Sequence, residues 1–326
     1  MGKKMLLVAM IMALSWSLSA EKAIGAEKIV VGYPTTSSQF APLWLAKDAG
    51  LYKKHGLDAE LVFVRGYNLI QAMMAAQVDV AQTAVADAVV AILRGADIRF
   101  LGLTAKIFPY TLITTREIKT GKELKGGKIA INKLADVSEI ATRLALKELG
   151  LTEKDVTMIQ VGGSPQRLAA LQSGNVQAAA LDFMSGLRLA KEGYNVLIQI
   201  SPSYPYLGLM ASGKFIREKP AATEAFVKAF AEAVARFKGN KDEGVKVISH
   251  YMKSNDLEIV GKAYDFIATK FYAEDLQPDP KSFQNLLEEL SGSEPLARKA
   301  SIDQIFDLRI VNKLEQEGFF KSVFKK

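Results

Sequence analysis

The stretch LQSGNVQAAALDF, residues 171–183, repeats the pattern of MMAAQVDVAQTAV, residues 73–85. The two stretches align when Val176 is placed on Val78, and at the same shift Gly193 falls on Gly95. A similar shift sets KIAINK (128–133) on KIVVGY (28–33). A period of about 100 residues is longer than the 20–50 residues of solenoid repeats and close to one α/β domain. The sequence therefore predicts two copies of one domain.

Short β-rich runs alternate with helical runs in both copies. In the first copy we expect strands at 29–33, 60–64, 78–82 and 98–103 and helices at 40–54, 68–76 and 86–94. In the second copy we expect strands at 128–132, 157–161, 177–181 and 196–200 and helices at 137–149, 165–173 and 184–192. This alternation predicts α/β domains with parallel sheets that helices cover on both faces.

Two strand-like segments connect the copies, 110–115 before the second copy and 206–212 after it. Two such crossings would hinge one domain on the other. From Lys219 onward the chain is nearly all helical, and Phe226, Phe230, Val234 and Phe237 share one apolar face. We expect a first domain of residues 27–115 plus 206–326, with the C-terminal helices packed on it, and a second domain of residues 116–205.

The first 26 residues have the pattern of a secretory signal peptide. Lys3 and Lys4 precede an apolar run from Met5 to about Leu18. Cleavage after Ala20 or Ala26 is expected; the alternative, an uncleaved anchor helix, needs roughly 20 apolar residues. The chain has no cysteine and hence neither a lipoprotein anchor nor a disulfide framework. We expect an exported, soluble protein, periplasmic in a host with an outer membrane.

The net charge is only mildly positive, +7 for the whole chain and about +5 once residues 1–26 are removed. Basic residues stand beside acidic ones, as in KELKGGK and NKLEQEG, which is typical of a solvated surface. Together with the export signal, this charge pattern argues against a nucleic-acid partner.

The loops after the strands are the expected binding region, because ligands of parallel α/β sheets lie outside the carboxyl ends of the strands. The helices that start there offer free N–H groups. The candidate ligand-binding residues are Thr35, Thr36, Ser37, Ser38, Gln39, Gln82, Thr83, Lys106, Lys133, Asp136, Ser138, Gly163, Ser164, Asp182 and Phe183.

Helix capping is the alternative role for several of these residues. Asp136 and Glu139 form a D-x-x-E capping pattern, and GGSPQ (162–166) places Ser164 as an N-cap with Pro165 at the first helical position. The loops acquire a binding role if the two domains face each other, carboxyl end to carboxyl end.

Signals for catalysis are weak. His55 and His250 lie far apart, and no H-E-x-x-H, Walker or dinucleotide-binding pattern is present in the sequence. We expect no catalytic residue, no metal and no cofactor.

Three stretches resemble one family: APLWLAKDAGLYKKHGLDAELVFV (41–64), MMAAQVDVAQTAV, and SPQRLAALQSGNVQAAALD (164–182). They are similar to the solute-binding proteins of nitrate, sulfonate and taurine ABC importers, a group that includes binders of thiamine-pyrimidine precursors. The resemblance covers the mature chain. It implies a two-domain periplasmic-binding-protein-like fold (type II), no enzymatic activity, and capture of a small organic solute between the domains for an ABC permease.

Asp182 departs from many relatives, which have small or neutral residues at that position. A carboxylate there suits a ligand with an amine or a ring N–H, or it caps the helix that starts near Met184. Lys106 and Lys133 are placed to meet a carboxylate or sulfonate, or they are solvated rim lysines. The solute class stays open among sulfonates, carboxylates, amino-acid-like and heteroaromatic molecules.

Two other functions remain alternatives. Some relatives of this fold make the thiamine pyrimidine by cysteine- and histidine-dependent chemistry, which the absence of cysteine disfavours. An exported sensing module that docks on a membrane receptor would share every feature of the pocket. We expect the solute-binding protein to be a monomer.

Overall fold

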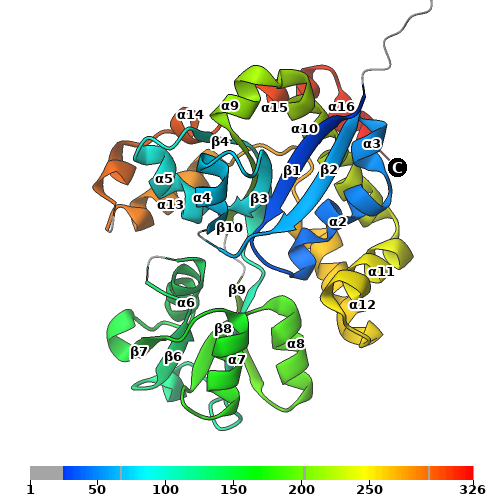
Figure 1. Ribbon diagram of the computed structural model, residues 1–326. Helices are drawn as coiled ribbons and strands as arrows, with labels where there is room; N and C mark the ends of the chain where they lie inside the picture. The colour runs from blue at the N-terminus through cyan, green and yellow to red at the C-terminus, as the bar shows by residue number, and fades with distance from the viewer. Residues whose placement is uncertain (1–24, 67, 135, 201–202, 293, 326) are drawn as a thin grey trace, which may run out of the picture.

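The computed structural model describes residues 25–325 except 67, 135, 201–202 and 293, and it folds into two lobes (Figure 1). Nearly all of the predicted signal peptide lies outside the described residues. Each lobe is built on a five-stranded sheet with helices packed against it. The predicted α/β architecture of two duplicated domains is confirmed.

The first sheet has the strand order β2-β1-β3-β10-β4. Its strands are β1 (Glu27–Tyr33), β2 (Leu57–Phe63), β3 (Val80–Ala84), β4 (Ile98–Ile107) and β10 (Ser203–Ser212). The second sheet has the order β7-β6-β8-β5-β9. Its strands are β5 (Tyr110–Thr114), β6 (Lys128–Ile131), β7 (Thr157–Gln160), β8 (Ala178–Asp182) and β9 (Asn195–Ile200).

Both sheets are mixed, so the prediction of parallel sheets is wrong for one strand in each. In the first sheet β10 runs antiparallel to β3 and β4, and in the second β5 runs antiparallel to β8 and β9. These are the two strands that cross between the copies. A strand arriving from the other lobe enters its new sheet from the end where the parallel strands finish, and it therefore runs against them.

The crossing strands exchange lobes. The chain leaves the first sheet after β4, and β5 already pairs within the second sheet, with Tyr110 opposite Asp182. The return strand β10 pairs with the first sheet along its length, from Ser203 opposite Ile107 to Ser212 opposite Ile98. Strand pairing thus assigns 110–114 to the second lobe and 203–212 to the first.

Helices pack against both sheets, and the C-terminal helices all belong to the first lobe (Figure 1). Those that alternate with the strands are α2 (Ala41–Asp48) with α3 (Leu51–Lys54) directly after it, α4 (Asn68–Met74), α5 (Val85–Leu93), α6 (Val137–Glu148), α7 (Ser164–Gln172), α8 (Phe183–Lys191) and α9 (Gly213–Glu218). The C-terminal ones are α10 (Pro220–Gly239), α11 (Lys241–Met252), α12 (Leu257–Phe266), α13 (Pro280–Leu290), α14 (Ile302–Ile305), α15 (Arg309–Gln316) and α16 (Phe319–Phe324). Short 3₁₀ turns occupy Ser38–Phe40, Lys122–Leu124, Glu153–Asp155 and Pro295–Lys299, and a π-helical turn, Ile267–Phe271, extends α12.

The single helix expected at 40–54 is two helices in the structure. Gly50 has a φ of 68°, and this left-handed conformation ends α2 and turns the chain into α3. A residue with a Cβ would be strained there, which explains why glycine stands at this position.

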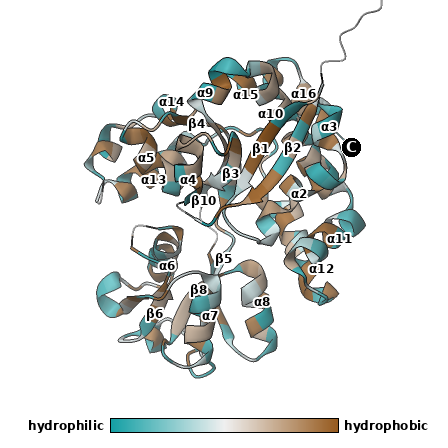
Figure 2. Ribbon diagram, viewed as in Figure 1, coloured by the Kyte–Doolittle hydropathy of each residue, from teal (hydrophilic) through white to brown (hydrophobic). Residues whose placement is uncertain are grey.

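Apolar strands and helix faces form the core, as the brown strands of Figure 2 show. On α10 the four residues expected on one apolar face, Phe226, Phe230, Val234 and Phe237, are all fully buried. The face packs on α2 and α3, so the C-terminal helices cover the first lobe as predicted.

Candidate functional site

The candidate site lies where the ends of strands from both lobes approach each other. Two crossing-strand tyrosines meet there: the ring of Tyr110 on β5 lies 6.3 Å from that of Tyr206 on β10. The charge of Asp87, at the start of α5 in the first lobe, interacts with Asp136 and Lys133 of the second lobe. We call these residues and the adjoining strand-end loops the interlobe site.

The loop after β1 is only partly exposed. Thr35 and Thr36 are solvent-exposed, whereas Ser37, Ser38 and Gln39 are buried. The Ser37 hydroxyl donates to Gln39 Oε1 over 3.1 Å, and Gln39 Nε2 donates to the Tyr206 hydroxyl over 2.9 Å. Gln39 therefore holds the loop against the return strand β10.

Gln82 and Thr83 on β3 are buried inside the first lobe, with exposed fractions of 0% and 1%. Gln82 Nε2 donates to the Thr104 hydroxyl (3.0 Å) and to the Tyr272 hydroxyl (3.2 Å). Tyr272 in turn donates to the backbone oxygen of Gln39. This network joins two of the predicted site residues to the C-terminal part of the chain.

Asp136 and Ser138 begin helix α6. The Asp136 carboxylate accepts from the backbone nitrogens of Ser138 (3.0 Å) and Glu139 (3.1 Å) and from the Ser138 hydroxyl (2.7 Å). The predicted cap at Asp136 is confirmed. Both side chains are buried, and the Ser138 hydroxyl also accepts from the backbone nitrogen of Asn132.

The start of α7 differs from its prediction by one residue. Gly163, not Ser164, is the N-cap, so Ser164 is the first helical residue and Pro165 the second. Proline is tolerated in the first turn because its missing N–H would be unpaired there anyway. With glycine as the N-cap, no side chain caps the helix.

Arg167, in the first turn of α7, was not among the predicted site residues. Its side chain is buried, with 3% exposure, and it donates to the backbone oxygen of Gly162 (3.3 Å) and to the Ser164 hydroxyl (3.0 Å). Its Nε has no hydrogen-bond partner, and no carboxylate pairs with it among the described residues. Its position in the sequence was a signal for a binding role. An arginine in the first turn of a helix is unfavourable, because the helix dipole disfavours a cation at the N-terminus.

Asp182 and Phe183 begin α8. The Asp182 carboxylate accepts from the backbone nitrogen (3.1 Å) and the hydroxyl (2.7 Å) of Ser185, so it caps the helix, as one of its two expected roles required. The ring of Phe183 stacks on Phe266 of α12, with centroids 4.4 Å apart.

The two candidate lysines lie in different settings. Lys106 on β4 forms an ion pair with Asp275 over 2.9 Å within the first lobe. Lys133 is solvent-exposed in the loop after β6, and its charge reaches Asp87 across the lobes. Lys133 therefore lies within electrostatic reach of a charge of the opposite lobe, whereas the ion pair of Lys106 stays within its own lobe.

The interlobe environment shifts two pKa values. Burial, with a further contribution from Asp136, raises the pKa of Asp87 to about 6, and Lys133 opposes this change. Burial also raises the pKa of Tyr110. The charge of Arg167 opposes this rise, and the charges of Asp136 and Asp182 add to it. Tyr110 thus lies within electrostatic reach of α7, α6 and α8. Neither Asp87 nor Tyr110 was among the site residues predicted from the sequence.

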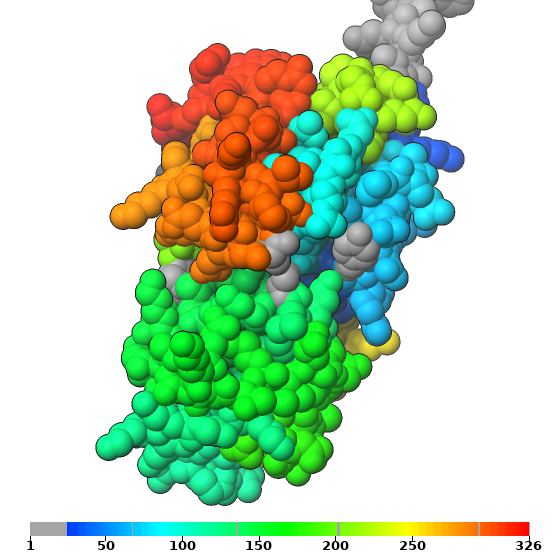
Figure 3. Space-filling model, turned by 90° about the vertical axis from the view of Figure 1, so that its left-hand side faces the viewer, coloured from blue at the N-terminus to red at the C-terminus, as the bar shows by residue number. Residues whose placement is uncertain are grey.

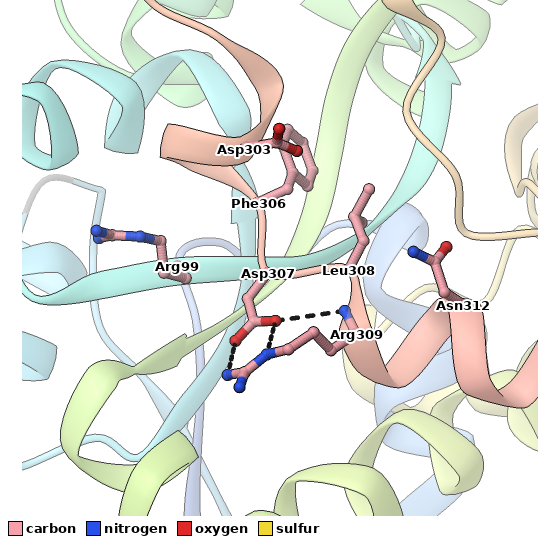
Figure 4. Close-up of a pocket in the computed structure, with 7 residues that line it drawn as sticks. All are labelled: Arg99, Asp303, Phe306, Asp307, Leu308, Arg309 and Asn312. Carbon is pink, nitrogen blue, oxygen red and sulfur yellow. Dashed lines mark hydrogen bonds and ion pairs between the residues drawn. The ribbon is translucent and has the colours of Figure 1, made fainter.

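A separate pocket of about 340 Å³ lies on the first lobe, between the start of β4 and the C-terminal helices (Figure 4). Arg99, Asp307 and Arg309 line it, and Asp307 accepts two charged hydrogen bonds from Arg309. Since Arg99 stands at the amino end of β4, this pocket is at the opposite end of the sheet from the interlobe site.

In the part of the chain that the structure describes, histidine and acidic side chains nowhere gather in a group of three or more that is able to hold a metal ion. None of the described helices combines the length and the apolar character needed to cross a membrane.

Comparisons with known proteins give one consistent answer. A family model described as NMT1/THI5 like matches residues 37–243. The putative aliphatic sulfonates-binding protein of Escherichia coli K12 is 24% identical over 263 residues, which cover 76% of this chain and 78% of that protein.

Solved structures share the fold at low identity. The periplasmic aliphatic sulphonate binding protein of Escherichia coli has a TM-score of 0.71 and 20% identity, with 86% of this chain and 92% of that chain covered. The periplasmic nitrate-binding protein of Synechocystis PCC 6803 has a TM-score of 0.70 and 16% identity, with 90% and 89% covered. The likeness places the chain among proteins with the periplasmic-binding-protein fold.

Proposed function

Because this chain belongs to the NMT1/THI5-like family, we propose that it is the solute-binding protein of an ABC importer. It captures a small organic anion between its lobes and delivers it to a membrane permease. We expect it to work as an exported monomer, without a cofactor and without catalysis. Relatives named for a ligand include a putative aliphatic sulfonates-binding protein and a nitrate-binding protein, which fits an anion-binding role.

The observation that carries the choice of an anion is Arg167. A buried guanidinium without a carboxylate is costly, because removal of a charge from water is repaid only by a partner of opposite charge. Arg167 has two neutral acceptors, Gly162 O and Ser164 Oγ, and an unpartnered Nε. An anionic group of the solute would supply the missing partner.

The start of α7 adds to this preference. The helix is uncapped, and its N-terminal N–H groups and dipole favour an anion. Gly162 and Gly163 precede it, and glycines allow a close approach of a ligand to the backbone. The planar fork of arginine matches a group with two oxygens, so a carboxylate or a sulfonate is the expected head group.

The acidic residues of the interlobe site do not demand a cationic solute. Asp136 and Asp182 each cap a helix, and the charge of Asp87 lies within reach of Lys133. We therefore place the anion beside Arg167 and Tyr110 rather than a solute amine beside Asp182.

Calorimetric titration of the purified protein with matched solutes tests the proposal. An alkanesulfonate and an alkanoate are compared with the alcohol and the amine of the same chain length. We expect affinity for the anions alone, and we expect Arg167→Met to weaken it roughly ten- to a hundred-fold, the loss of a hydrogen bond between charged groups.

Two further variants make the result specific. Arg167→Lys keeps the charge but loses the planar fork, so it should fall between the wild type and Arg167→Met. Arg188→Met removes an exposed arginine of the same lobe and should bind like the wild type. Affinity for the amine but not the anions, or equal affinity in all three variants, would refute the assignment of Arg167.

The alternative function, an exported sensing module, predicts a different outcome. It would be favoured if no small molecule bound the protein and a purified receptor domain bound it instead.

A further inference from the structure

A second cavity lies between the lobes, away from the strand-end loops. Its volume is about 710 Å³, which is within the usual range of small-molecule sites. Three separate segments line it: Lys147 and Glu148 from α6, Ser203 and Tyr204 from the start of β10, and Glu288 and Glu289 from α13. Figure 3 shows the side of the molecule on which the C-terminal helices meet the second lobe. We call this space the hinge cavity, because β10 is one of the two crossing strands.

The lining of the hinge cavity is acidic. Glu148, Glu288 and Glu289 outnumber the one ammonium group, Lys147. Within the described residues, none of these three carboxylates forms a hydrogen bond or an ion pair. Carboxylates elsewhere in the chain commonly have such partners, for example Glu224 with Lys228 and Lys313. The charge of Glu289 interacts with Arg143 and Lys147 of α6, without a direct ion pair. The cavity therefore combines negative charge from both lobes that no ion pair neutralises directly.

Tyr204 gives an independent indication of a ligand. The residue is 3% exposed, its ring packs on Phe108 with centroids 4.1 Å apart, and its hydroxyl has no hydrogen-bond partner. The hydroxyl lies within electrostatic reach of Glu289 in the cavity wall and of Asp87 in the interlobe site. A buried hydroxyl without a partner is costly, and a hydrogen-bonding group that reached it from the cavity would satisfy it.

The occupant should be an extended organic cation. A metal ion is disfavoured, since the described acidic side chains here are not grouped for metal ligation and the volume far exceeds that of an ion. A single ammonium would neutralise only part of the lining. Carboxylates stand on both sides of the cavity, Glu148 on α6 and Glu288 with Glu289 on α13, so two positive groups at the ends of a short chain match their distribution.

We propose that the hinge cavity is a second binding site, which takes a small organic diammonium ion and ties α6 of the second lobe to α13 of the first. This site is separate from the anion site beside Arg167 and does not depend on the proposed transport function. The walls of the hinge cavity belong to different lobes. A bound diamine therefore stabilises the lobe arrangement in which the carboxylates of α6 and α13 are separated by the distance between its two ammonium groups. Occupation therefore changes the equilibrium between lobe arrangements.

Thermal unfolding with 1,4-diaminobutane, with butylamine and with 1,4-butanediol tests the proposal on the full mature chain. We expect the diamine to raise the midpoint by several degrees at 100 times its Kd, butylamine to act more weakly and the diol not at all. In Glu288→Gln/Glu289→Gln the diamine shift should vanish. In Glu315→Gln/Glu317→Gln, which removes two exposed carboxylates from α15 and the residue after it, the shift should remain.

Two more measurements separate a site from general attraction of cations. Calorimetry should give one diamine per chain, and Tyr204→Phe, which keeps the ring on Phe108, should weaken that binding without abolishing folding. Arg167→Met should leave diamine binding unchanged even though it weakens solute binding, so the two proposals fail separately. Equal diamine shifts in the Glu288/Glu289 and Glu315/Glu317 variants, or no saturable binding to the wild type, would overturn the second site.

Discussion

The ring of Phe183 stacks on the ring of Phe266, with centroids 4.4 Å apart and an interplanar angle of 20°. Phe183 begins α8 in the second lobe and Phe266 ends α12 in the first. The pair therefore joins the lobes through residues that do not belong to the crossing strands. Lys191, at the other end of α8, extends the contact by ion pairs with Asp256 (3.1 Å) and Glu258 (2.7 Å). The lobes are therefore linked by side chains as well as by the chain itself.

Phe266→Ala should loosen this link. We expect a loss of unfolding free energy of about 1–3 kcal/mol, from the aromatic pair and the apolar area that the rings bury. Without solute, small-angle scattering should show a broader distribution of lobe arrangements. Leu257→Ala on the same helix is the control, because Leu257 is 64% exposed and should change neither quantity. Identical scattering of Phe266→Ala and the wild type would show that the stack does not restrain the lobes.

Gln82→Ala should act on stability rather than on solute binding. Gln82 is completely buried and donates to Thr104 and Tyr272, so its loss leaves two hydroxyl groups with fewer partners. We expect the unfolding free energy to fall by about 1–3 kcal/mol in total, because each hydroxyl loses an incoming donor but keeps its own donated bond, Thr104 to Leu207 O and Tyr272 to Gln39 O. Denaturant unfolding measures the loss, and titration of the surviving folded protein should give a solute affinity close to that of the wild type. A large loss of affinity at unchanged stability would return Gln82 to the binding site.

The repeat predicted the architecture well because the two copies share local sequence preferences. Strands β3 and β8, and helices α5 and α8, occur at the same shift of 98 residues that aligns Val78 with Val176. The caps at Asp136 and Asp182 were also foreseeable, since each needs only residues two or three positions away.

The features that the sequence did not predict depend on distant contacts. The direction of β5 and β10 is set by the sheet that each enters, and it is invisible in their own residues. Gln39 and Gln82 were predicted to contact the ligand because they follow or end strands. In the structure, Gln39 donates a hydrogen bond to Tyr206, 167 residues away, and Gln82 donates one to Tyr272, 190 residues away. Arg167 became a candidate only once the structure showed its burial without a carboxylate.

Asp182→Asn tests whether the carboxylate does more than cap α8. Asparagine caps a helix about as well as aspartate, so the unfolding free energy should change by less than about 1 kcal/mol, whereas Asp182→Ala should cost about 1 kcal/mol. If the solute is an anion, removal of the negative charge should leave its affinity unchanged or raise it. Calorimetry on both variants decides the matter: a loss of affinity of tenfold or more in Asp182→Asn as well as in Asp182→Ala would mean that the carboxylate meets a positive group of the solute.

Asp87→Asn should change how stability depends on pH. Burial first, and then the charge of Asp136, raises the pKa of Asp87 from its usual 3.8 to about 6 in the folded protein, while Lys133 opposes the rise. Between about pH 4 and pH 6 the folded state therefore holds a proton that the unfolded state has released, so this residue's contribution to stability declines as the pH rises through that window. At neutral pH the ionised carboxylate costs up to about 3 kcal/mol, which corresponds to a shift of roughly two pKa units. The asparagine carries no charge and avoids this cost. The stability of Asp87→Asn relative to the wild type should therefore rise by about 1–3 kcal/mol between pH 4 and pH 7.

Chemical unfolding of both proteins at pH 4 and at pH 7 measures this difference. The control is Asp242→Asn, which removes an exposed carboxylate from the first turn of α11 and should follow the pH dependence of the wild type. Parallel pH profiles for Asp87→Asn and the wild type would mean that Asp87 ionises as freely in the folded chain as in the unfolded one, and that the interlobe site does not desolvate it.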